Sequence, residues 1–204
     1  MFALRTIIEN SLYAIRISLK ADAPLEKDDI TDLYTDAFDT LINHWSDTEY
    51  LFTFFENNSE DLNAGYFSEI RNIEEAVLIT LEDAAQLEDR ILHIAKAGQN
   101  EGHINLQNLF KPLYNNEKSI YPIPEHQHSK AYGSANKSWL RVYALRIEKN
   151  LFIITGGAIK LTRTMNDRPH LVEELNKMKA VKSWLIENGV FDLDSLVEFM
   201  EIDL

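Results

Sequence analysis

The stretch from Trp139 to Met165 constrains the fold more than any other, because long apolar and β-branched runs alternate there with very short polar breaks. Runs of this kind, bounded by turn residues, are typical of adjacent strands. The tripeptide Glu148-Lys149-Asn150 fits a hairpin turn, and Gly156-Gly157 indicates a bulge or a close backbone approach. We therefore expect neighbouring strands over 139–147, 151–155 and 158–164.

Most of the remaining chain has the apolar spacing of helices. Asn72, with Glu75 three residues later, resembles a capping box, and Gly98 is placed to end that helix with a left-handed residue. Pro169 suits the first turn of another helix, which Gly189 ends. We expect helices over 29–45, 50–55, 72–98 and 169–189, followed by a short one through 200 that Asp192 or Asp194 caps.

One further segment has the alternation of a half-buried strand, Ser11–Leu19. The polar, proline-containing segment 99–137 predicts a long loop with one short helical turn within 106–113. Together these patterns predict a single α+β domain over 1–204, in which a small antiparallel sheet from 11–19 and 139–164 packs against several helices.

The composition narrows the chemistry. The chain has no cysteine, which excludes disulfides and thiolate ligands or nucleophiles. Its N-terminus lacks the apolar run of a signal peptide, and no segment approaches the ~18 apolar residues of a membrane helix, so we expect a cytoplasmic protein without membrane contact.

The charge is distributed unevenly. Residues 137–182 carry ten Lys and Arg against four Asp and Glu, whereas the whole chain has a formal charge of −13. The helical segment 28–98 is correspondingly acidic. A negative mean field repels phosphate, so only the local basic region is suited to bind an anion.

Within the basic region, a period of two places Arg141 and Tyr143 on one face of their strand, and Lys160 lies on the next strand. Two fixed cations beside a phenol suit a phosphodiester, whose charge builds on non-bridging oxygens during transfer. The alternative is that these cations merely solvate the outer face of a sheet.

Three strings resemble a known family: Arg-Val-Tyr-Ala-Leu at 141–145, Asn-Leu-Phe-Ile-Ile-Thr-Gly-Gly-Ala-Ile-Lys-Leu-Thr-Arg-Thr at 150–164, and Leu-Gln-Asn-Leu-Phe-Lys-Pro-Leu at 106–113. The first two are similar to the C-terminal hairpin of RelE/HigB-type toxins, with Leu161 where that family has a second lysine, and the third resembles the segment that leads into that sheet. The resemblance covers about residues 104–165 and implies a RelE-like core with helical additions.

The resemblance also implies a function in a toxin-antitoxin system. It implies metal-independent cleavage of RNA at the ribosome, without a cofactor, and a cognate antitoxin protein as partner. Arg141 matches the strand arginine of the family and Lys160 the first lysine of its Lys-Lys-Thr string.

Other residues are weaker candidates. Tyr143, His126 and His128 are candidates for proton transfer or stacking, and the RNA-binding candidates are Lys137, Arg146 and Arg163. The histidine pair can equally be solvated surface, and a metal site there needs a further ligand.

The acidic helices admit two interpretations. Their carboxylates can simply solvate the faces opposite the apolar stripes, or they can cover the basic sheet as an antitoxin would. The second functional hypothesis is a non-catalytic module that binds protein partners. The oligomeric state is left open.

Overall fold

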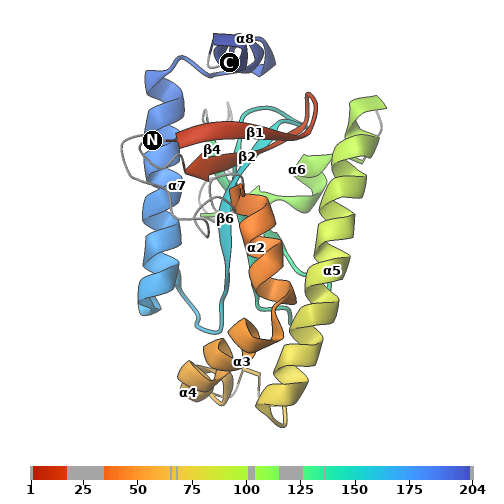
Figure 1. Ribbon diagram of the computed structural model, residues 1–204, viewed down its shortest axis with the longest axis vertical. Coiled ribbons are helices and arrows are strands. Elements are labelled where there is room, and N and C mark those ends of the chain that lie inside the picture. Colours follow the sequence, from red (N-terminus) through yellow and green to blue (C-terminus); the bar gives the residue numbers. More distant parts are fainter. Residues whose placement is uncertain are drawn as a thin grey trace, which may run out of the picture.

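The structure is a computed structural model that describes residues 2–17, 35–64, 66–67, 69–100, 104–114, 126–135 and 137–202. It confirms the α+β prediction: helices lie on both faces of one six-stranded sheet (Figure 1). The strands are β1 Phe2–Ile8, β2 Leu12–Ile17, β3 Lys111–Pro112, β4 Gln127–Tyr132, β5 Leu140–Arg146 and β6 Phe152–Ile159, in the spatial order β1-β2-β6-β5-β4-β3.

The sheet is mixed, whereas the sequence predicted a purely antiparallel one. β2 runs parallel to β6, with Tyr13 opposite Ile153, and the other neighbouring pairs are antiparallel. Parallel neighbours need a long crossover. Here the helices between β2 and β6 in the sequence provide it.

The helices follow the predicted order. They are α2 Ala37–Ser46, α3 Thr48–Asn57, α4 Ser59–Leu62, α5 Ile73–Ala97, α6 Leu106–Leu109, α7 Pro169–Glu187 and α8 Leu193–Ile202. The part of the predicted first helix at 29–34 and the end of the predicted strand at 18–19 lie outside the described residues. None of the helices in the described ranges is long and apolar enough to cross a membrane.

The helix ends show the predicted caps with two differences. The Asn72 side chain accepts the Glu75 N–H at 2.9 Å, but the Glu75 carboxylate accepts the N–H of Arg71, so the capping box is only half formed. Gly98 has φ −70° rather than a left-handed conformation, because the chain continues into a 3₁₀ turn over Gly98–Asn100. Asp192 caps α8 by accepting the Ser195 N–H.

Each face of the sheet has its own apolar core. Leu12, Val142 and Ile154 face α2, α3 and α5, whereas Ile15, Leu145 and Ile153 face α7 and α8. Figure 1 shows α5 and α7 along opposite sides of the sheet. Since side chains of a strand alternate between faces, odd-numbered positions of β5 lie on the α7 side.

The C-terminal strands differ from the prediction in one respect: residues 151–155 and 158–164 do not form two separate strands. β6 is continuous to Ile159 and then leaves the sheet. Tyr143 pairs with Gly156 and Ala144 with Ile154, so Thr155 forms the predicted bulge. Gly157 allows a close approach, because a Cβ there would lie 2.5 Å from the Arg141 carbonyl oxygen.

Three strands were missed by the sequence analysis: β1, β3 and β4. The predicted long loop is wrong at 127–132, which forms β4. Its buried positions include Gln127 and Ser129, so the apolar alternation that identifies a strand is absent.

Candidate functional site

A pocket of about 420 Å³ lies on the α7 side of the sheet, beside β4, β5 and the segment after β6. Four of its lining side chains are cationic: Lys130, Arg141, Lys160 and Arg163. No Asp or Glu is among the described residues that line it. We call it the basic pocket. Its other walls are aromatic, apolar or neutral: Tyr114, Tyr132, Tyr143, Leu113, Met165, Leu175, Thr164 and Asn166.

The register of β4 and β5 brings the floor of this pocket together. Tyr132 lies opposite Arg141, and Lys130 lies opposite Tyr143. The Arg141 guanidinium carbon is 4.0 Å from the centroid of the Tyr132 ring, and the Lys130 Nζ is 5.7 Å from the same centroid. Tyr132 and Arg141 are cross-strand neighbours, whereas Lys130 and Tyr132 lie two residues apart on one face of β4.

Arg141 is oriented by the backbone. Its Nη1 donates to the carbonyl oxygens of Ser138 at 2.8 Å and Leu140 at 2.6 Å. Burial lowers the pKa of Arg141, an effect that the nearby Tyr132 and Tyr143 phenols oppose. Arginine still remains charged near neutral pH, so the pocket holds a fixed, partly desolvated cation.

Lys160 is held similarly, just beyond the end of β6. Its Nζ donates to the carbonyl oxygens of Thr162 at 2.5 Å and Arg163 at 2.7 Å. Burial lowers the pKa of Lys160, the charges of Arg141 and Lys130 lower it further, and Asp167 raises it. The cations of the pocket therefore repel one another.

Tyr143 contributes a polar atom without a partner. The residue is 1% exposed, and its hydroxyl makes no hydrogen bond within the described part of the chain. Burial raises the pKa of Tyr143, so the phenol stays protonated. An unsatisfied buried hydroxyl is costly.

Both predicted histidines lie outside the basic pocket. His128 shares the face of Lys130 but stands opposite Leu145. Burial lowers its pKa to about 4, with a further contribution from Lys182 and Lys179. The His126 Nε2 lies 2.6 Å from the Val190 carbonyl oxygen. His126 therefore fastens β4 to the C-terminal segment.

Of the predicted RNA-binding residues, only Arg163 lines the basic pocket. Lys137 forms an ion pair with Glu69 at 3.0 Å. Arg146 donates to the Gln107 side chain of α6 at 2.9 Å, on the opposite side of the sheet. The sequence analysis missed Lys130 and Tyr132, although His128, Lys130 and Tyr132 follow the period of two that could have indicated a strand face.

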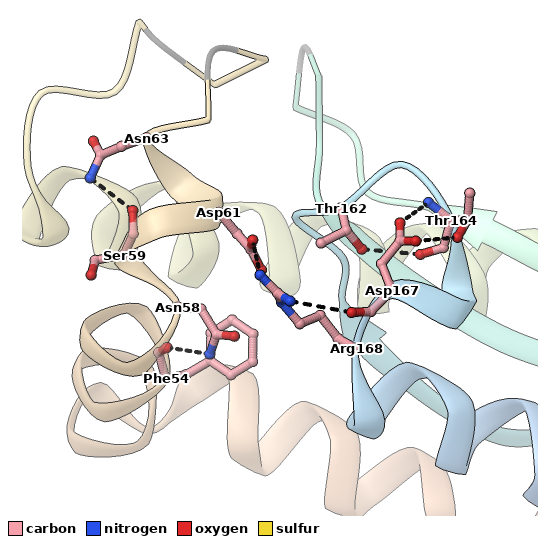
Figure 2. A network of polar contacts seen from close by, with 9 residues as sticks. All are labelled: Phe54, Asn58, Ser59, Asp61, Asn63, Thr162, Thr164, Asp167 and Arg168. Carbon is pink, nitrogen blue, oxygen red and sulfur yellow. Dashed lines mark hydrogen bonds and ion pairs between the residues drawn. The ribbon is translucent and has the colours of Figure 1, made fainter.

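The loop that carries Arg163 is fastened at its base (Figure 2). Asp167 accepts the Thr164 N–H and the Thr164 hydroxyl, both at 2.7 Å. The Arg168 Nε donates to Asp61 of α4 at 2.6 Å, and the two side chains form an ion pair. One wall of the basic pocket is therefore anchored to α4.

The described residues of the acidic helical segment 28–98 do not cover the basic pocket. None of the described residues within 35–98 lines it, and α5 packs on the other face of the sheet. The interpretation that the acidic helices cover the basic sheet as an antitoxin would therefore finds no support in these residues.

A second pocket of about 520 Å³ lies between α2, α7 and Gly156-Gly157 of β6. Glu174 lines it and forms an ion pair with Lys177 at 2.5 Å. Burial raises the pKa of Glu174. Because this pocket contains carboxylates, it is not suited to anions.

No protein-family model, curated protein or solved structure matches this chain. Within the described ranges, no group of three or more His, Asp or Glu side chains is arranged to hold a metal ion. The function therefore has to be argued from the chemistry of the basic pocket.

Proposed function

We propose that the basic pocket binds a phosphate group of RNA, as expected of a toxin-like protein. The observation that carries this proposal is that four cations and no carboxylate, among the described lining residues, surround one pocket in a chain of net charge −13. Mutually repelling cations are destabilising until an anion neutralises them. Such a cluster is explained by a ligand and not by folding.

Aromatic side chains support a nucleic-acid ligand over a bare anion. Tyr114 and Tyr132 line the pocket and are each 39% exposed. Single-stranded RNA is commonly bound by cations that contact the backbone and by aromatic rings on which bases stack.

RNA cleavage is the second candidate. A 2′-hydroxyl that attacks the adjacent phosphorus must lose its proton, and the 5′-oxygen must gain one. Lys160, whose pKa is lowered by burial and by Arg141, favours this candidate, because it can accept the first proton and return it to the 5′-oxygen. No imidazole or carboxylate lines the described part of the pocket, which favours the alternative of binding without cleavage.

The test compares two double variants with the same change of charge. Arg141→Gln/Lys160→Gln alters the basic pocket, whereas Lys137→Gln/Arg146→Gln alters two cations outside it. We expect the first to weaken binding of a 3′-labelled 12-nucleotide RNA at least tenfold, and the second to weaken it less than threefold. Equal losses would contradict the proposal.

The same three proteins serve to test activity. If the pocket cleaves RNA, expression of the wild type and of the Lys137/Arg146 variant arrests growth and yields RNA fragments, whereas the Arg141/Lys160 variant does neither. Binding without fragments or arrest identifies a binding module. A cognate antitoxin would then be sought by co-purification with the wild type.

A further inference from the structure

We infer that the basic pocket selects a nucleoside 5′-monophosphate group, either as a free nucleotide or as the 5′ end of an RNA, over an internal phosphodiester. This inference rests on the proposed function and specifies its ligand.

The number of cations is the first argument. A phosphodiester carries one negative charge, whereas a phosphate monoester carries between −1.5 and −2 at about pH 7 and offers three terminal oxygens. Lys130 and Arg141 both lie near the Tyr132 ring, and Lys160 is close enough to both for their charges to affect it. A dianion matches this cluster better than a monoanion does.

Donor geometry is the second argument. The described hydrogen bonds of Arg141 use only Nη1, which leaves its other N–H groups for a ligand. Lys130 lines the same pocket, and its ammonium group, with three N–H donors, has one described hydrogen bond, to the Leu113 carbonyl oxygen. Several donors converging on one point suit a terminal phosphate.

The walls of the pocket are the third argument, because their side chains can contact a nucleobase as well as a phosphate. Tyr114, Tyr132 and Leu175 offer aromatic and apolar surface, and Asn166 adds an amide that can donate and accept. A nucleobase stacks on an aromatic face while its edge is hydrogen-bonded. The volume of about 420 Å³ leaves room for one nucleotide.

The charge outside the pocket is the fourth argument. Most of the chain is acidic, so phosphates that continue on both sides of a bound internal phosphodiester would meet a repelling field. A terminal phosphate enters the pocket with fewer phosphates around it. This difference disfavours the middle of a long strand.

The experiment is calorimetric titration of the full-length protein with AMP, adenosine, inorganic phosphate, and a 12-nucleotide RNA with either a 5′-phosphate or a 5′-hydroxyl. We expect AMP to bind at least tenfold more tightly than adenosine or inorganic phosphate. The 5′-phosphorylated RNA should bind at least tenfold more tightly than its 5′-hydroxyl form. AMP binding that is stronger than binding of the phosphorylated RNA would identify a free nucleotide as the ligand.

Three single variants locate the binding. Arg163→Gln, at an exposed position of the pocket, should weaken AMP binding about fivefold to tenfold, and Lys137→Gln should leave it unchanged. Tyr132→Leu should lower the ratio of AMP to phosphate affinity, which a purely electrostatic site would not show.

The outcomes separate the two proposals. Equal binding of both RNAs, with Arg163→Gln weakening both, would overturn the inference and leave RNA binding intact. No binding of any of these ligands, or binding that Arg163→Gln does not affect, would overturn both.

Discussion

Arg141 and Lys160 are positioned by backbone carbonyl oxygens and not by carboxylates. Carbonyl groups orient a cation without neutralising its charge. Arg168 differs from these two residues, because it forms an ion pair with Asp61 that neutralises its charge. At the scale of residues, the site is therefore recognised by its cations, which form no ion pair with a carboxylate within the described chain.

His128 provides a prediction about stability and pH. Its folded pKa is about 4, below the value of about 6.5 in an unfolded chain. The unfolded state therefore binds more protons between these values, so stability is fully present above pH 6.5 and is lost as the pH falls toward 4. The imidazole is only half-buried, so we expect on the order of 1 kcal/mol.

The measurement is the free energy of unfolding in urea at pH 7 and pH 5, for the wild type and His128→Phe. We expect the wild type to lose more stability than the variant does over this interval. The subtraction removes the titration of carboxylates, which both proteins share. An identical loss in both would show that His128 is not titrating as expected.

The sequence predicted part of the site, and the reason lies in particular residues. Arg141, Tyr143 and Lys160 were expected to converge, and they do line one pocket, because the register shift at Thr155 pairs Arg141 with Ala158, two residues before Lys160. Lys130 and Tyr132 were missed because β4 has polar side chains on both faces. His128 was predicted as a site residue but lies outside the basic pocket. The sequence does not show which residue of the neighbouring strand lies opposite it.

At the scale of elements, β6 depends on a glycine. A Cβ at Gly157 would lie 2.5 Å from both the Arg141 carbonyl oxygen and the Leu41 side chain. We expect Gly157→Ala to lower the free energy of unfolding by about 2–3 kcal/mol, because the backbone of β5 cannot move away cheaply.

Gly189 is the matched control for that variant. Its φ is +73°, but nothing lies within 4 Å of an added Cβ, so Gly189→Ala should cost only about 1 kcal/mol. Both values come from urea denaturation. A smaller effect at Gly157 than at Gly189 would contradict the packing described here.

At the scale of the whole molecule, the acidic and basic halves of the sequence are not separable units. β2 lies between β1 and β6, and its Leu12 and Ala14 are fully buried. The N-terminal hairpin and the C-terminal hairpin thus share one sheet. The sequence analysis predicted that 11–19 and 139–164 share a sheet, but not that β2 runs parallel to β6, because pairing between distant strands leaves no local pattern.

Truncation tests this organisation. Deleting residues 1–8 removes β1, a strand at the edge of the sheet, and should lower stability while leaving a cooperative unfolding transition. Deleting residues 1–17 also removes β2 and opens both apolar cores, so we expect no cooperative transition by circular dichroism. A cooperative fold after the longer deletion would contradict the shared sheet.

The central claim is that the basic pocket is the binding site. The most direct measurement is a titration of ¹⁵N-labelled protein with AMP, followed by amide shifts in two-dimensional NMR. We predict shifts concentrated at residues 130–132, 141–143 and 160–166, with little change at Lys137 and Arg146. Saturating shifts elsewhere, or none at these positions, would contradict the account.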